Sequence, residues 1–168
     1  MSLFYWYNWF MNKTNALRLL DTKKIKYDVF EYSTSGSIDA VSVAQYLNEN
    51  PCQVFKTLVT VSNTNINYVF VVPGNGELDL KKAAKLVNEK SIDMIPQKNL
   101  LPLTGYIHGG CSPVGMKKLF KTVIDESAKD FEYIFVSAGK IGMQIKINPD
   151  DLVDVINGVY GDIKKWSM

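Results

Sequence analysis

The chain has 168 residues, of which 46% are hydrophobic and 21% are charged, and its formal net charge is +2 at pH 7. This length and composition predict a single domain that buries its own core without disulfides. Because the net charge is small, the chain as a whole is not a strongly basic nucleic-acid binder, and any such contact has to use a local patch. Cys52 and Cys111 lack the number and spacing of a disulfide framework or a zinc site, which favours a reducing, cytoplasmic location.

The first ten residues, MSLFYWYNWF, contain six aromatic side chains and no charge. The stretch is too short to span a bilayer, and it lacks the basic start and small-residue cleavage site of a signal peptide, so no membrane partner is expected. Met11 and the residues after it are typical of a bacterial N-terminus that opens a helix. We therefore predict an aromatic extension at 1–12 and a domain at 13–168. The alternative is an aromatic arm that packs on the domain or on a partner.

The first half of the domain alternates between helical and strand patterns. In chain order we expect a helix at 15–22, a strand at 27–32, a loop at 33–37, a helix at 40–47 and an antiparallel pair of strands at 54–61 and 68–72. Thr14 is the predicted N-cap of the first helix, and Ser37 or Asp39 that of the second.

The second half continues in the same way. We expect a turn at 73–76, a helix after the cap Asp79 with Leu80 on its inner face, strands at 92–95, 122–124, 133–136 and 143–147, a small-residue loop at 137–142, a helix from Asn148 or Asp150 to 156, and a tail that holds Trp166. Short turns between several strands exclude a purely parallel doubly wound sheet. The predicted fold class is α/β: a single domain with a mixed, mostly antiparallel, curved sheet or partial barrel, and helices on the outside.

Residues 105–115, GYIHGGCSPVG, hold four glycines and one proline; we call this segment the glycine loop. Glycine allows close backbone approach and positive φ, whereas Pro113 fixes φ and removes a donor. The pattern is typical of a rigid loop whose N–H groups bind a carboxylate, a phosphate or a developing oxyanion. The alternative is an ordinary turn between strands.

Lys56 interrupts the apolar strand pattern around QVFKTLVT. A charge in such a strand either faces water on the open side of the sheet or points into a polar cleft, where it can bind a phosphate or carboxylate. Ser137 opens the second small-residue segment. It is either part of a turn or a hydrogen-bond donor in the same cleft.

Several enzyme classes are excluded by missing residues. His108 is the one histidine, so a site with two or three histidine ligands is impossible and a catalytic relay has to use this residue. The phosphate-binding motif GxxxxGK[ST] and the dinucleotide motif GxGxxG are both absent. We therefore expect neither a metal nor an organic cofactor.

Six short motifs occur in an order that is specific to one family. They are KTNA at 13–16, FKTL at 55–58, ELDLKKAAK at 77–85, TGY with GGCSPVG at 104–106 and 109–115, TVIDESA at 122–128, and VSAGK at 136–140. On these motifs the chain resembles the YbaK-type Cys-tRNA(Pro) deacylases, which are relatives of the editing domain of bacterial prolyl-tRNA synthetases. The resemblance runs from about Lys13 to about Val155.

The resemblance implies a set of site residues. Implied catalytic residues are Lys56, Gly109 and Gly110, and implied substrate-binding residues are Phe30, Tyr32, Ser112, Pro113, Ser137 and Gln144. Some members of the family carry an aspartate at the position of Gln144. This departure removes a charge and puts a catalytic or amine-binding role at position 144 in doubt.

The family mechanism implies that the thiol of the substrate cysteine attacks its own ester carbonyl, so that proximity supplies most of the rate. Backbone N–H groups at Gly109 and Gly110 then stabilise the oxyanion, and Lys56 holds the terminal phosphate or ribose. Cys111 is not expected to be a nucleophile, because related chains carry Val or Ile there and the sequence shows no base beside it.

The resemblance implies the 3′ end of an aminoacylated tRNA as the ligand and prolyl-tRNA synthetase as a partner. A synthetase pocket rejects a near-isostere such as cysteine poorly, so a second, hydrolytic site is required. Two alternatives stay open: a deacylase of Ala-tRNA(Pro), and a non-catalytic module that docks on tRNA or on the synthetase. The missing aspartate at position 144 favours the second alternative.

Overall fold

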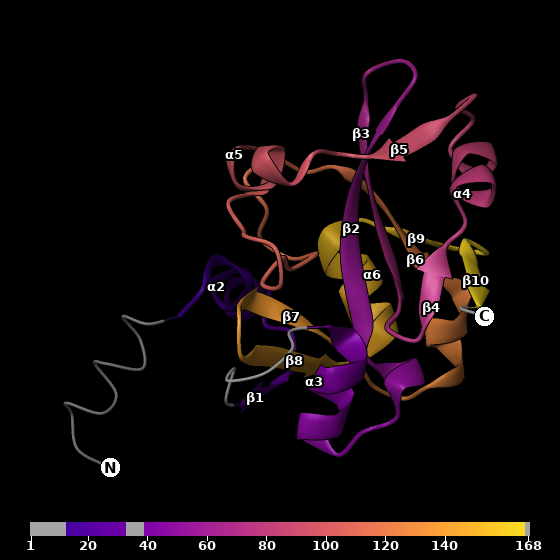
Figure 1. The fold of residues 1–168 in the computed structure, drawn as a ribbon. Helices are drawn as coiled ribbons and strands as arrows, with labels where there is room; N and C mark the ends of the chain where they lie inside the picture. Colours follow the sequence, from indigo (N-terminus) through magenta and orange to yellow (C-terminus); the bar gives the residue numbers. More distant parts are fainter. Residues whose placement is uncertain (1–12, 33–38, 167–168) are drawn as a thin grey trace, which may run out of the picture.

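The structure is a computed structural model, and it describes residues 13–32 and 39–166 (Figure 1). The aromatic extension at 1–12 and the candidate cap Ser37 lie outside these residues. None of the described helices has the length and apolar character needed to cross a bilayer.

The described chain alternates helices and strands along its whole length. The helices are α2 (Asn15–Thr22), α3 (Ala40–Leu47), α4 (Leu80–Leu86), α5 (Leu100–Thr104) and α6 (Pro149–Ile156), with 3₁₀ turns η1 (Pro51–Gln53), η2 (Gln97–Asn99) and η3 (Glu126–Asp130). The strands are β1 (Asp28–Glu31), β2 (Phe55–Ser62), β3 (Asn67–Pro73), β4 (Gly76–Leu78), β5 (Ile92–Met94), β6 (Lys121–Asp125), β7 (Ile134–Lys140), β8 (Met143–Ile147), β9 (Val159–Gly161) and β10 (Lys164–Trp166).

The strands form a mixed five-stranded sheet and two smaller antiparallel sheets. The large sheet has the order β5-β2-β3-β6-β9, antiparallel from β5 to β3 and parallel from β3 to β9. The second sheet is β1-β8-β7, the third is β10-β4, and a single bridge between Val54 and Phe135 links the first two. The mixed α/β fold class predicted from the sequence is confirmed, but the described strands do not close into a barrel.

Side-chain caps set the helix starts where the sequence predicts them. Thr14 accepts a hydrogen bond from the N–H of Leu17, and Asp39 accepts one from Ser42 at the start of α3. Asp79 caps α4, and Asn148, one of the two predicted candidates, caps α6. Each cap satisfies N–H groups that the first turn of a helix leaves without a partner.

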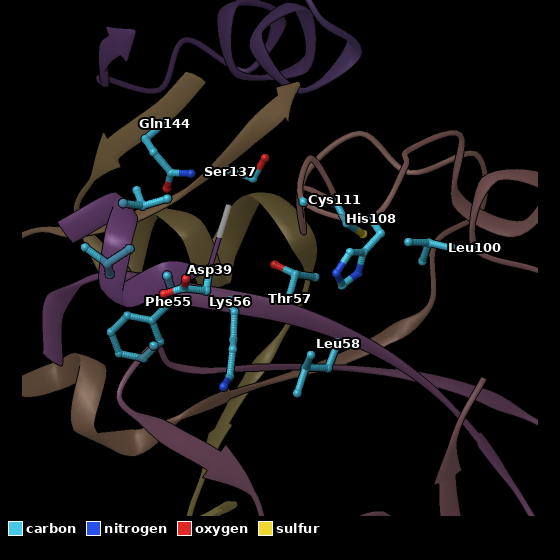
Figure 2. A pocket seen from close by; sticks show the side chains of 15 residues that line it. Asp39, Phe55, Lys56, Thr57, Leu58, Leu100, His108, Cys111, Ser137 and Gln144 are labelled. Carbon is cyan, nitrogen blue, oxygen red and sulfur yellow. The ribbon is translucent and has the colours of Figure 1, made fainter. Parts of the chain in front are cut away.

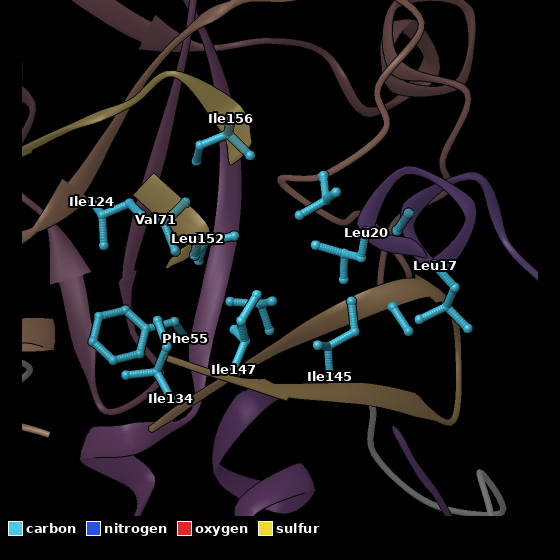
Figure 3. Packing of buried hydrophobic residues seen from close by; sticks show 14 of the residues in the cluster. Leu17, Leu20, Phe55, Val71, Ile124, Ile134, Ile145, Ile147, Leu152 and Ile156 are labelled. Atoms are coloured by element: carbon cyan, nitrogen blue, oxygen red, sulfur yellow. The ribbon is translucent and has the colours of Figure 1, made fainter. Parts of the chain in front are cut away.

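The main core fills the space between the two larger sheets. Leu17 and Leu20 of α2 pack with Ile145 and Ile147 of β8, and Leu152 of α6 closes the cluster (Figure 3). A second cluster lies around Phe70 of β3, on the α4 side of the large sheet. In Figure 1, β2 and β3 stand between the three-stranded sheet with α2 and the pair β4 and β10.

Three sequence-based expectations are wrong. Residues 137–140 continue strand β7 instead of forming a loop, because Gly139 leaves room for the ring of Tyr106, whose Cε1 would lie 2.6 Å from a Cβ at position 139. The tail around Trp166 is strand β10, which pairs with β4. Leu80 is 37% exposed, because it is the first residue of α4, ahead of the turn that buries Ala83 and Ala84.

Asp125 fixes the C-terminal strand to the large sheet. This side chain is 0% exposed and accepts hydrogen bonds from the N–H groups of Ser127 and Ile163, both at 3.1 Å. One of its carboxylate oxygens lies 3.3 Å from Nζ of Lys164 in β10. The carboxylate therefore ties the end of β6 to the start of β10.

We predict that Asp125→Ala lowers the free energy of unfolding by about 3 kcal/mol, because it leaves two buried N–H groups without acceptors and Lys164 without its counter-ion. The control is Asp162→Ala, which removes an exposed 3.2 Å ion pair with Lys82 and should cost less than about 1 kcal/mol. Urea denaturation of both variants measures the difference. Equal losses would contradict the anchoring role of Asp125.

Candidate active site

A cavity of about 370 Å³ opens between β2, α3, the glycine loop and the hairpin of β7 and β8 (Figure 2). We call it the central cavity. Its size suits the reacting end of a small-molecule or aminoacyl ligand. It is lined by Asp39, Ala40, Val43, Val54, Phe55, Lys56, Thr57, Leu58, Gly74, Leu100, His108, Gly109, Cys111, Ser137 and Gln144.

Strand β2 supplies the polar floor of the cavity. Successive side chains of a strand point to opposite faces, and Figure 2 shows Lys56 and Thr57 leaving β2 on opposite sides. Lys56 lines the cavity and is half-buried. Burial lowers the pKa of its ammonium, while attraction by Glu77 and Asp39 opposes this shift. Its ammonium points away from Ser137 and Gln144 (Figure 2), so a ligand-binding role for Lys56 stays a prediction.

The two glycines implied as catalytic are placed differently. Gly109 lines the cavity with φ of 85°, a conformation that glycine adopts without strain. Gly110 packs against the turn between β7 and β8, where an added Cβ would lie 3.0 Å from the backbone N of Ile141. Its own N–H donates a 3.0 Å hydrogen bond to the carbonyl oxygen of Ile107. No described residue accepts a hydrogen bond from the N–H of Gly109 or of Cys111.

Ser112 and Pro113, which the resemblance implies in substrate binding, are buried residues of the glycine loop. Ser112 Oγ accepts a hydrogen bond from the N–H of Val114 at 3.2 Å, and Pro113 lines a separate small hollow beside α6. Neither residue is among those that line the central cavity. Both fix the shape of the loop that carries Gly109.

Phe30 and Tyr32 of the β1 region lie behind the cavity wall. Phe30 is 38% exposed and packs edge-on against Phe135, with ring centroids 5.7 Å apart. The hydroxyl of Tyr32 accepts a 3.4 Å hydrogen bond from Nε2 of Gln144, and its ring stacks on Tyr46. Tyr32 therefore contacts the cavity-lining residue Gln144, whereas Phe30 contacts Phe135, which does not line the cavity.

Ser137 and Gln144, two residues implied in substrate binding, form a cross-strand pair. They face each other in the register of β7 and β8, and both line the cavity as buried residues. Ser137 Oγ accepts a hydrogen bond from the N–H of Gly139 at 3.2 Å, which leaves its own proton to donate. Oε1 of Gln144 is buried without a partner among the described residues.

Thr57 lines the cavity, although sequence reasoning did not single it out as a site residue. Its Oγ1 is also buried without a partner among the described residues. The signal was present: Thr57 follows Lys56 directly in the FKTL motif, so strand alternation sends one of the two residues to each side of β2. Asp39 was expected only as a helix cap, but it also lines the cavity.

The titratable residues of the glycine loop do not form a nucleophile and base pair. Burial raises the pKa of the Cys111 thiol to about 12, although a hydrogen bond with Thr104 opposes the shift. The thiol is therefore protonated near neutral pH, and a thiol is a poor nucleophile. His108 is exposed at the rim. Among residues 13–32 and 39–166, no group of three or more His, Cys, Asp or Glu side chains could hold a metal ion.

Comparisons with known proteins identify the family of this chain. The family model described as "Aminoacyl-tRNA editing domain" matches residues 35–155. The chain is 46% identical over 152 residues to the Enterococcus faecalis protein named "Putative Cys-tRNA(Pro)/Cys-tRNA(Cys) deacylase EbsC", with 90% of this chain and 93% of that protein covered.

Solved structures with the same fold were also found. A "putative trans-editing enzyme for prolyl tRNA synthetase" superposes with a TM-score of 0.80 at 26% identity, covering 90% of this chain and 95% of the other. The hypothetical protein APE2540 gives a TM-score of 0.83 at 18% identity, covering 90% of this chain and 100% of the other, which shows the fold alone. The resemblance found in the sequence is confirmed: the chain belongs to the aminoacyl-tRNA editing domain family.

Proposed function

We propose that this protein is a trans-acting deacylase that hydrolyses Cys-tRNA(Pro). The observation that carries the proposal is the chemistry of the central cavity. It offers free N–H groups, a serine hydroxyl and one lysine, but its cysteine is protonated near neutral pH, and within residues 13–32 and 39–166 no hydrogen bond joins the thiol to His108. Such a site can orient an ester and stabilise an oxyanion, but it needs the nucleophile to come from the ligand. A relative that is 46% identical is named for cysteinyl-tRNA deacylation.

The proposed reaction begins with the substrate. The cysteine Sγ attacks its own ester carbonyl carbon, forming a C–S bond, and the carbonyl oxygen becomes an oxyanion. When the C–O bond to the ribose breaks, the proton lost from the thiol ends on the ribose oxygen, which becomes a hydroxyl. The product is a strained cyclic thioester, and water hydrolyses it to free cysteine.

The glycine loop supplies the oxyanion donors in this scheme. We assign them to the N–H groups of Gly109 and Cys111, for which the described residues provide no acceptor. Gly110 acts through the loop shape, because its N–H is bound to Ile107. Lys56 binds the terminal phosphate or ribose at the cavity, and Ser137 donates to the ester.

The remaining implied residues support those that contact the ligand. Tyr32 orients Gln144, Phe30 supports β7, and Ser112 and Pro113 shape the loop. We place the reaction in the cytoplasm, where charged tRNA is made, with prolyl-tRNA synthetase as the partner that delivers the tRNA.

A deacylation assay tests the function directly. We expect the protein to release amino acid from Cys-tRNA(Pro) much faster than from Ser-tRNA(Pro) or Ala-tRNA(Pro), because a hydroxyl is a poorer nucleophile than a thiol and alanine has none. Preferential release of alanine would instead identify an Ala-tRNA(Pro) deacylase. Binding of all three tRNAs without release of the amino acid would identify a non-catalytic module. The missing aspartate at position 144 favours that alternative.

Two variants test the assigned residues. Lys56→Ala should lower kcat/KM for Cys-tRNA(Pro) roughly 10- to 100-fold by removing a charge-assisted contact, with the melting temperature retained. Gly109→Ala should lower it by a similar factor, because a side chain at φ of 85° strains the loop. The control is Lys90→Ala, an exposed lysine that does not line the cavity. An equal loss of kcat/KM in Lys90→Ala would show that the overall positive charge matters, and not the position of Lys56.

Cys111 gives a separate prediction. At pH 7.5 iodoacetamide should alkylate Cys111 more slowly than Cys52, because the thiolate form of Cys111 is scarce and the side chain is buried. Mass spectrometry of tryptic peptides against time measures both rates. Cys111→Ser should keep most of the deacylase activity. Fast alkylation of Cys111, together with an inactive but folded serine variant, would make Cys111 the nucleophile.

A further inference from the structure

A small hollow of about 80 Å³ lies between α2, the end of the glycine loop and α6. We call it the apolar hollow, because Lys118 is the one charged side chain among the described residues that line it. Leu119, which lines it too, is 77% exposed, more than any other large apolar side chain within residues 13–32 and 39–166. It shares the hollow with the half-buried side chains of Leu19, Met116 and Phe120. An exposed apolar patch of this kind indicates a site that another apolar surface covers.

The chain that precedes α2 enters the domain beside this hollow. Gly115 lines the hollow, and a Cβ added to it would lie 2.8 Å from the carbonyl carbon of Asn15. The hydroxyl of Thr14 donates a hydrogen bond to the carbonyl oxygen of Ala138 in β7. These contacts fix the start of α2 against the glycine loop and β7, and Figure 1 shows the segment after α5 running down to α2. The residues before Lys13 therefore begin next to the wall of the apolar hollow.

We propose that the aromatic extension, residues 1–12, docks in the apolar hollow and covers Leu119. Residues 1–10 carry six aromatic side chains and no charge. Exposed together, these rings would form an uncharged apolar surface, whereas docking removes about 150–250 Å² from water for each ring that is buried. Twelve residues reach at most about 40 Å, so the extension is long enough to cover a hollow that begins at the contact with Asn15.

The other hollow near the start of α2 does not suit this occupant. Lys13 and Asp21 pair at its edge, and three lysines and four carboxylates line it in all. An uncharged aromatic segment offers these groups no counter-charge, so covering them would cost their hydration without a compensating contact. The apolar hollow carries only one charge, and the ammonium of Lys118 can stay in water at the end of its flexible stem.

Docking supports the glycine loop from outside the central cavity. Pro113 and Gly115 of the loop line the apolar hollow, whereas Gly109 of the same loop lines the central cavity. Leu119 is not among the residues that line the central cavity. The extension therefore stabilises the loop without contacting the candidate active site. This contact does not depend on the deacylation reaction, and the test below reads it without any tRNA.

Tryptophan fluorescence of the full chain tests the docking. The three tryptophans are Trp6, Trp9 and Trp166, so Trp166→Phe leaves the two in the extension as reporters and keeps an aromatic ring beside Lys164. The bimolecular constant for acrylamide quenching should be about half or less of the constant for N-acetyltryptophanamide, because a docked indole is shielded from the quencher. Leu119→Glu in this background should bring the constant close to that of N-acetyltryptophanamide, because a carboxylate disfavours an apolar occupant.

Leu101→Glu is the matched control. Leu101 is 50% exposed on α5 and does not line the apolar hollow, so this variant should keep the shielding. Thermal melting supplies a second readout. Leu119→Glu should lower the Tm by about 2–5 °C in the wild-type chain, but by less than about 1 °C in the Trp6→Ser/Trp9→Ser chain, because the two sites are coupled only when they are in contact.

Quenching equal to that of N-acetyltryptophanamide in the folded Trp166→Phe protein would overturn the proposal. Full shielding in folded Leu119→Glu would overturn it too, because the extension would then be buried elsewhere. Shielding that disappears when the protein is diluted about a hundredfold would show that a second copy covers the tryptophans, and so would also contradict docking within one chain. None of these results bears on whether the protein hydrolyses Cys-tRNA(Pro).

Discussion

The contact between Tyr106 and the β7–β8 hairpin determines where the cavity can form. The Tyr106 ring occupies the space that a side chain at position 139 would need, and its hydroxyl donates to the Val114 carbonyl at 2.7 Å. On the same hairpin, Gly110 packs against the backbone of Lys140 and Ile141. These contacts hold the glycine loop over β2. A larger residue at position 110 or 139 would separate the loop from the hairpin and open the cavity wall.

Strand β2 supplies two of the polar side chains that line the cavity, Lys56 and Thr57. It is paired on both edges, with β3 and β5, so its side-chain register cannot slip without disturbing the core. Phe55 packs into the main core, and two residues later the same face carries Thr57 into the cavity. Lys56 lies between them on the other face. A cation and a neutral acceptor thus reach different parts of the ligand from neighbouring positions.

Local features of the fold were readable from the sequence. The caps Thr14, Asp39 and Asp79 act within three residues along the chain, so short-range patterns reveal them. The extent of β7 was not readable, because it depends on Tyr106, which comes some thirty residues earlier. Strand β10 was missed for the same reason: Asp125 holds it through a contact distant in sequence.

The sequence also pointed to several of the residues that line the cavity. The family resemblance pointed to Ser137 and Gln144, and both line the cavity, but their facing positions in β7 and β8 came only from the structure. The sequence did not settle whether Lys56 faces solvent or a cleft, because strand alternation assigns residues to two faces and does not say which face is exposed to solvent. The sequence could not separate the roles of Gly109 and Gly110, because both lie in one loop. The structure separates them, because the N–H of Gly110 donates a hydrogen bond to the carbonyl oxygen of Ile107.

The central claim is that the ligand supplies the nucleophile and the protein supplies position and hydrogen-bond donors. Single-turnover deacylation of S-methyl-Cys-tRNA(Pro), compared with Cys-tRNA(Pro), tests it most directly, because methylation blocks thioester formation while the side chain stays nearly the same size. The account predicts that the methylated substrate still competes for binding but reacts about a thousandfold more slowly or worse. A rate within about tenfold of Cys-tRNA(Pro) would contradict it and require a nucleophile from the protein or from water.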